Sequence, residues 1–183
     1  MTDGHEAGVP VWDPFVRVYH WVQAALIAAA WLSADEWKSL HEWLGYAVAL
    51  LVALRLVWGF VGPRRARFSD FVRGPRAVFA YLRDLAAGRE PRMLGHNPAG
   101  GAMIVALLAT IAATALTGWL QTTDAFWGSE AVEALHEGLA TAILVLVAGH
   151  VLGVMLESWR HRENLALAMV TGRKRPLAGD EGR

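Results

Sequence analysis

Residues 132–157 read VEALHEGLATAILVLVAGHVLGVMLE, an apolar stretch with one histidine in each half, His136 and His150. A helix that crosses a bilayer needs about 20 mainly apolar residues. Three other stretches meet this requirement, at 15–34, 40–62 and 98–121. We therefore predict an all-α integral membrane protein: a bundle of four transmembrane helices, forming a single domain over residues 15–157.

The composition supports this class and excludes several chemistries. Of the 183 residues, 55% are hydrophobic and only 19% are charged, which is too apolar for an ordinary soluble domain. The chain has no Cys, so disulfides, thiolate zinc sites, iron–sulfur clusters and c-type haem attachment are excluded. The 17 basic and 17 acidic residues cancel. Nucleic-acid-binding domains carry a basic excess, and we expect no nucleic-acid partner.

The positions of the basic residues predict how the chain crosses the membrane. Apart from Arg17 and Arg55, nearly all of them lie in the loop 63–97 or after residue 157. The two short connections on the opposite side contain a single basic residue, Lys38. Basic loops stay in the cytoplasm. We therefore expect a multi-pass membrane protein with both termini in the cytoplasm.

This orientation defines three cytoplasmic segments: the tail 1–14, the loop 63–97 and the tail 158–183. The first tail has no apolar core like that of a cleavable signal, so we expect the first span to act as the targeting signal. Within the loop, Pro75 begins an amphipathic stretch that we predict to be an interfacial helix. The lipid bilayer is thus the first expected partner.

Ionisable side chains inside spans are costly, which makes each one a candidate functional residue. Four histidines meet this criterion: His20, His41, His136 and His150. At about 1.5 Å of rise per residue, His41 and His136 lie within roughly 10 Å of the outer face. The same count puts His20 and His150 roughly 20 to 27 Å below that face. We call His41 and His136 the outer pair, and His20 and His150 the inner pair.

Both pairs use one histidine of the last span, where the spacing from His136 to His150 is nearly four turns, about 21 Å, so the two point to nearly the same side. Two imidazoles that face each other across a bundle can occupy both axial positions of a haem iron. Zinc in a structural site needs four ligands near one point. We therefore predict two haem b groups. Any single histidine could instead be a hydrogen-bonded core residue.

Haem propionates need basic partners at the correct depth. Arg55 lies at the depth of the inner pair and Arg17 near the cytoplasmic end of the first span, so we expect both to contact the inner propionates. Lys38 is the outer candidate. Snorkelling is the alternative for Arg17 and Lys38. For His96, at the start of the third span, we expect a propionate or quinone contact, or a place in a helix-starting turn.

Several short motifs occur in a fixed order along residues 12–175: RVYHW at 17–21, HEWLG at 41–45, GHNP at 95–98, TGW at 117–119 and REN at 162–164. In order and spacing they resemble the bacterial cytochrome b561 and Ni,Fe-hydrogenase b-type cytochrome family. The resemblance implies a four-helix membrane cytochrome with two b haems and the four histidines as axial ligands. It also implies electron exchange among quinones, periplasmic proteins and partner enzymes.

We therefore expect transmembrane electron transfer between an outer-face partner, such as a periplasmic cytochrome or redox enzyme, and a quinone or cytoplasmic-side partner. No residue resembles a nucleophile or general base, so enzyme status depends on whether a quinone is reduced. Two alternatives stay open: a small transporter or ion-translocating module that uses intramembrane His and Arg, and a haem-stabilised anchor for a redox enzyme. A homodimer also stays open, because the bundle exposes much surface.

Overall fold

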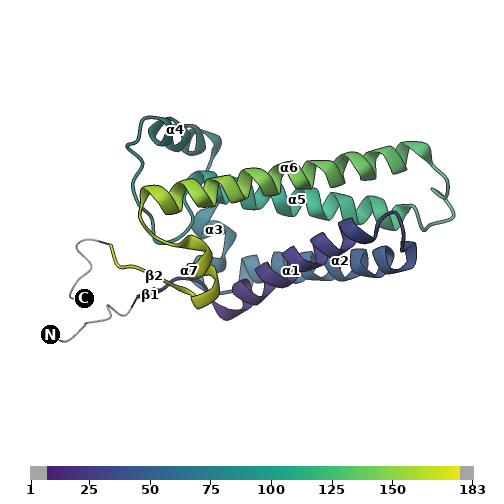
Figure 1. Ribbon diagram of the computed structural model, residues 1–183, viewed down its shortest axis with the longest axis horizontal. Coiled ribbons are helices and arrows are strands. Elements are labelled where there is room, and N and C mark those ends of the chain that lie inside the picture. Colours follow the sequence, from purple (N-terminus) through teal and green to yellow (C-terminus); the bar gives the residue numbers. More distant parts are fainter. Residues whose placement is uncertain (1–7, 178–183) are drawn as a thin grey trace.

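A computed structural model describes residues 8–177, and four long helices run side by side through most of it (Figure 1). Each helix is long and apolar enough to cross a membrane, which confirms the predicted class of an α-helical protein with four spans. The outer parts of the predicted tails, 1–7 and 178–183, lie outside the described residues. The spans are α1 (Pro14–Ser33), α2 (Lys38–Val61), α5 (Pro98–Leu120) and α6 (Glu130–Arg160).

Two of the spans begin at a polar cap followed by proline. The Asp13 side chain accepts a hydrogen bond from the Val16 N–H at the start of α1, at 3.2 Å. Asn97 accepts in the same way from Gly100 at the start of α5, at 2.7 Å. Each cap satisfies a helix N–H that has no partner inside the helix. Proline suits the next position because it has no N–H to satisfy.

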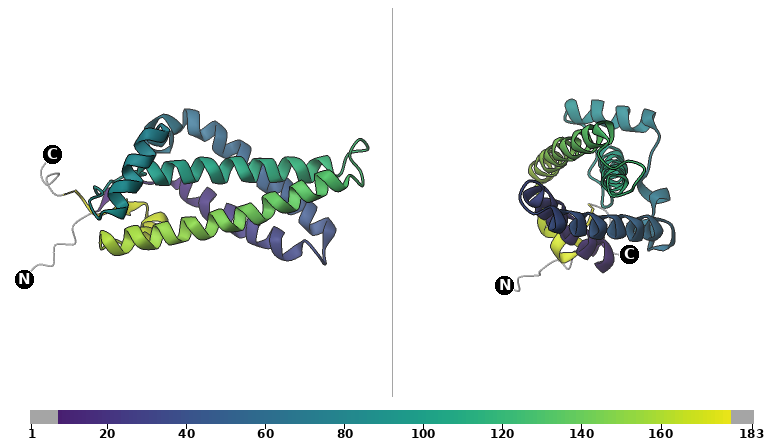
Figure 2. Two further views of the ribbon diagram at one scale, coloured as in Figure 1. Left: turned by 90° about the horizontal axis from the view of Figure 1, so that it is seen from above. Right: turned by 90° about the vertical axis from the view of Figure 1, so that its right-hand side faces the viewer.

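The spans pack in the order α1 on α2, α2 on α5 and α5 on α6. In the end-on view of Figure 2 the four spans surround a central space, with α5 and α6 on one side of it and α1 and α2 on the other. The buried core joins three of the helices at mid-height, through Val48, Val52, Ile111 and Ile143. The candidate histidines belong to α1, α2 and α6, so they come from both sides of this space.

Shorter elements gather at one end of the bundle. The chain between α2 and α5 forms η1 (Arg64–Ala66), α3 (Phe68–Phe71) and α4 (Pro75–Ala86), and α7 (Leu165–Thr171) follows α6. The helix predicted to begin at Pro75 is therefore present as α4. We call this the terminal end, and the end with the connections 34–37 and 121–129 the short-loop end.

A two-stranded sheet joins the two tails at the terminal end (Figure 1). β1 (Val9–Pro10) pairs antiparallel with β2 (Arg173–Lys174), with Val9 opposite Lys174. We call this sheet the tail clasp. Its neighbour Gly172 accepts hydrogen bonds from the N–H groups of Val11 and Trp12, at 2.8 and 3.1 Å. The clasp thus joins residues 9–10 to residues 173–174 at the terminal end.

Candidate functional site

The structure brings the four candidate histidines together as two pairs at different heights. In the outer pair, His41 of α2 faces His136 of α6, with ring centroids 6.1 Å apart and planes at 81°. In the inner pair, His20 of α1 faces His150 of α6, with centroids 6.2 Å apart and planes at 54°. One helix therefore contributes to both pairs, and a different helix supplies each partner.

Both separations suit two imidazoles on opposite sides of one metal ion. Two metal–nitrogen bonds of about 2 Å, plus about 1 Å from nitrogen to ring centre on each side, add to roughly 6 Å. The observed centroid separations agree with this sum. A flat group with its metal between the rings, such as haem, fits the same arrangement because it leaves both axial positions to protein ligands.

The outer pair has its imidazoles fixed by hydrogen bonds to backbone. His41 Nδ1 donates to the carbonyl of Ala30 at 2.8 Å. His136 Nδ1 donates to the carbonyl of Thr114 at 3.1 Å and lies 3.2 Å from the hydroxyl of Thr117. A carbonyl can only accept, so Nδ1 carries the proton in both rings and Nε2 is free to bind a metal.

Glycines leave space around the outer pair. A Cβ at Gly118 of α5 would come within 3.1 Å of His136 Cε1, closer than an ordinary contact. A Cβ at Gly45 or Gly138, near His41 and His136 in their own helices, would meet nothing within 4 Å. The first glycine lets the imidazole approach α5, and the other two border open space. The space at Gly45 lies beside His41, one turn away, and suits a flat ligand there, whereas Gly138 lies on the other side of α6 from the His136 ring.

Arg55 lies buried beside α3, with only 3% of its surface exposed. One guanidinium nitrogen, Nη2, donates to the carbonyl of Ala66 at 3.1 Å, and the group lies 5.2 Å from the ring centre of Phe68. The other terminal nitrogen, Nη1, is buried without a partner in the described residues. The side chain is thus held in place and keeps one free donor.

His96 lies between two aromatic rings at the terminal end. Its centroid is 4.5 Å from that of Trp12 and 4.8 Å from that of Phe71. Burial, together with the nearby charge of Arg55, lowers the pKa of His96 to about 3, so the ring is neutral at physiological pH. Arg17 lies at the same end and donates through Nη2 to the carbonyl of Val170 in α7.

Unpartnered buried nitrogens collect in the inner half of the bundle. Within the described residues, four such atoms belong to side chains singled out from the sequence: Arg17 Nε, His20 Nδ1, Arg55 Nη1 and His96 Nδ1. Neither histidine of the outer pair has such an atom. Buried polar groups normally have partners. Several unpaired nitrogens on basic side chains fit an acceptor-rich, anionic group, and haem propionates have that chemistry.

The structure also reveals a polar residue that the sequence analysis missed. Gln23 lies one turn from His20 in α1, on the side toward the outer pair, and is only 5% exposed. Both atoms of its amide are buried without partners in the described part of the chain. A lone amide inside an apolar span was the available signal, since such groups are costly in a membrane.

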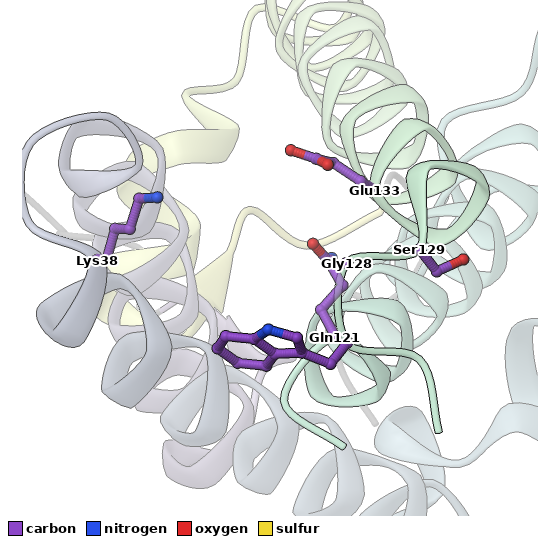
Figure 3. A pocket seen from close by; sticks show the side chains of 6 residues that line it. Lys38, Gln121, Gly128, Ser129 and Glu133 are labelled. Atoms are coloured by element: carbon purple, nitrogen blue, oxygen red, sulfur yellow. The ribbon is translucent and has the colours of Figure 1, made fainter. Parts of the chain in front are cut away.

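The two ends of the bundle have different openings. At the short-loop end a cavity of about 350 Å³ lies between α2 and the start of α6. Figure 3 shows Lys38 and Glu133 on its opposite sides, with Gln121 and Ser129 also in its lining. At the terminal end a hollow of about 290 Å³ between α1 and α7 is lined by Arg17, Val18, Trp21, Val22, Met169 and Val170.

Comparison with known proteins identifies the family. The family model described as prokaryotic cytochrome b561 matches residues 11–172, which is most of the chain and includes all four spans. No curated protein and no solved structure gives a significant match. The family resemblance noted in the sequence is confirmed by this match. The chain belongs to the prokaryotic cytochrome b561 family, and this membership implies b-type haem and electron transport in a membrane.

Proposed function

We propose that this protein transfers electrons across the bacterial inner membrane through two b haems, each held by a histidine pair. His41 and His136 would bind the outer haem, and His20 and His150 the inner one. The observation that carries the proposal is the pair geometry, with ring centroids 6.1 and 6.2 Å apart at two heights of one bundle. Bound haem supplies one-electron oxidation and reduction at its iron.

The residues of this chain would coordinate the haem iron, orient the coordinating imidazoles and neutralise the propionates. The carbonyls of Ala30 and Thr114 hold the outer imidazoles with Nε2 toward the metal. A hydrogen bond from the other ring nitrogen to a carbonyl also makes the ligating imidazole more basic. At the inner level, Arg55, Arg17 and His96 offer the buried donors that propionates require. Lys38 would take the same role at the outer level, from the wall of the short-loop cavity.

The openings at the two ends support different classes of electron partner. The cavity beside Lys38 is polar in part and opens at the short-loop end, which suits a periplasmic redox protein. The hollow between α1 and α7 has almost wholly apolar walls, which suits a lipid-soluble quinone. Trp21 lines that hollow and packs edge-on against His20, with centroids 5.0 Å apart. A quinone there would lie one side chain from the inner pair.

The test is an oxidised-minus-reduced absorption spectrum with haem counted per chain, for the wild type and for four variants. His20→Ala and His150→Ala should each remove the same haem, and His41→Ala and His136→Ala should each remove the other. His161→Ala, a histidine at the terminal end outside both pairs, should keep both haems. One haem in the wild type, or a variant pattern that crosses the pairs, would contradict the proposal. Absence of haem would favour the transporter alternative.

A further inference from the structure

Helix α4 lies across the terminal end, and it has two different apolar faces. Figure 2 shows it at right angles to the long axis of the bundle. Tyr81 is buried toward the bundle, and Val78 and Leu85 share that face by helical spacing. On another face, Phe79 is 72% exposed and Leu82 42% exposed. One face therefore packs on the protein, and the other has no protein partner among the described residues.

The contacts of α4 place it at the level of the lipid headgroups. The Tyr81 hydroxyl donates to Glu157 of α6 at 2.5 Å, and Arg160 of α6 donates to the carbonyl of Leu85 at 2.7 Å. With 31 residues, α6 is about 46 Å long, whereas the hydrocarbon core of a bilayer is about 30 Å thick. About 16 Å of α6 therefore lies outside the hydrocarbon, and the charged residues Glu157 and Arg160 favour placing part of this excess at the end that α4 contacts.

Arginines flank the exposed phenylalanine. Arg76 lies three residues before Phe79 and Arg83 four residues after it, so all three share one face of α4. Both arginines are exposed, and the only acid of the helix, Asp84, lies on a different face. Asp84 contacts Arg83 only at 3.9 Å and also pairs with Arg89. The charge on this face is thus largely uncompensated.

We propose that this face of α4 binds the headgroups of anionic phospholipids in the membrane that the protein spans. Phe79 would insert among the upper acyl-chain carbons, as aromatic residues do in interfacial helices. Arg76 and Arg83 would reach the phosphates on either side, because long basic side chains extend from an apolar surface to the headgroups. This site is separate from the histidine pairs and does not rest on the proposed electron transfer.

The site would have a structural effect beyond anchoring. Glu157, which accepts the hydrogen bond from Tyr81, also accepts one from Asn97 Nδ2 at 3.0 Å. Glu157 and His150 lie on nearly the same face of α6, seven residues apart. Lipid bound to the outer face of α4 would therefore stabilise the helix end that carries the inner pair. We expect anionic lipid to raise the melting temperature of the full chain.

The experiment measures which phospholipids stay bound to the purified full chain. The protein is incubated in mild detergent with equal amounts of phosphatidylglycerol and phosphatidylcholine, and retained lipids are counted by native mass spectrometry. The wild type should prefer phosphatidylglycerol. Each arginine near an anionic surface contributes about fivefold to binding, so Arg76→Gln/Arg83→Gln should weaken that preference by up to about 25-fold. Arg76→Lys/Arg83→Lys keeps the charge and should keep the preference.

Two further variants make the test specific. Arg162→Gln removes an exposed charge at the same end but outside α4, and it should leave the lipid preference unchanged. Phe79→Ser should weaken retention of both lipids, because it removes the apolar contact. Unchanged melting temperatures in lipid-free detergent show that the variants fold. The proposal is overturned if the double Gln variant keeps the wild-type preference, or if Arg162→Gln loses as much of it.

Discussion

The outer and inner histidine pairs have nearly the same separation but opposite surroundings. His41 and His136 each donate a hydrogen bond to a backbone carbonyl. In the inner pair, by contrast, His20 Nδ1 is buried without a partner, as are atoms of Arg55 and His96 nearby. The short-loop end has a partly polar cavity, whereas the hollow at the terminal end has almost wholly apolar walls.

This difference suggests that the two sites are organised in different ways. The outer imidazoles are held by the protein itself, so their orientation does not depend on a ligand. The inner site contains several basic nitrogens that lack partners, an arrangement that is unfavourable until an acceptor is present. We therefore expect the outer site to be sensitive to changes in shape, and the inner site to changes in charge.

The largest expected effect is a change of shape at the outer pair. Gly118→Val would place methyl groups against His136, because even a Cβ there comes within 3.1 Å of Cε1. The neighbouring ring is fixed by its hydrogen bonds and cannot move without losing them. We expect loss of the outer haem and retention of the inner one, seen as half the haem per chain.

Gly153→Val is the matched control for this prediction. Gly153 is also in a span, three residues from His150, but a Cβ there meets nothing within 4 Å. This variant should keep the haem bound by the outer pair. If Gly118→Val retains both haems with wild-type spectra, the close approach of His136 to α5 is not needed for ligation. The outer site would then not be more sensitive to shape than the inner site.

The next effect is a change of charge at the inner pair. Arg55→Met keeps most of the apolar volume but removes the guanidinium, whose Nη1 is proposed to neutralise a propionate. Breaking a buried charge pair costs about 3 to 5 kcal/mol, so affinity for the inner haem should fall by at least about two orders of magnitude. Haem remaining after prolonged dialysis in detergent measures this, and the outer haem should stay bound.

Arg65→Met provides the comparison for Arg55. Arg65 lies at the same end and also donates to one backbone carbonyl, that of Pro10 at 3.1 Å, but it is only half-buried, whereas Arg55 is buried. Its loss should leave both haems bound. Equal loss of inner haem in both variants would mean that general positive charge at this end, rather than the buried donor of Arg55, stabilises the site.

The predicted spans agree with the observed helices within a few residues because long apolar runs leave little choice of boundary. The largest difference is at the end of α6, which continues to Arg160 rather than stopping at residue 157. Polar partners explain the extension: Glu157 binds Tyr81 and Asn97, and Arg160 pairs with Glu90 at 2.8 Å. These partners come from the loop, whose path hydropathy does not predict.

The site was predictable to the extent that helix geometry decides it. Depth and spacing along four spans predicted which histidines could meet, and the structure brings those pairs together. The tail clasp was not predictable, since two residues in each strand carry no periodic signal. The contact between Arg17 and Val170 depends on that clasp and on α7. Tertiary contacts between distant segments therefore account for what the sequence analysis missed.

The smallest expected effect concerns the tail clasp at the terminal end. Arg92 binds both carboxylate oxygens of Glu163, at 2.8 and 3.3 Å, and the N–H of Arg175 donates to the same group at 2.6 Å. Burial alone would raise the pKa of Glu163, but these hydrogen bonds and the nearby charge of Lys174 outweigh it and lower the pKa below its ordinary value.

A carboxyl whose pKa is lowered by folding stabilises the fold above its ordinary pKa, about 4.3, and the contribution disappears as pH falls through the lower value. The clasp should therefore keep constant stability near neutral pH and loosen in acid. The test is hydrogen exchange of the Val11 and Trp12 amides, which bond to Gly172, expressed as protection factors relative to the intrinsic exchange rate at each pH. Glu163→Gln should cost about 1 to 3 kcal/mol at neutral pH and remove the acid dependence, whereas Glu133→Gln at the short-loop end should change neither. If the protection factors of these amides stay independent of pH in the wild type, the Glu163 ion pairs do not stabilise the tail clasp.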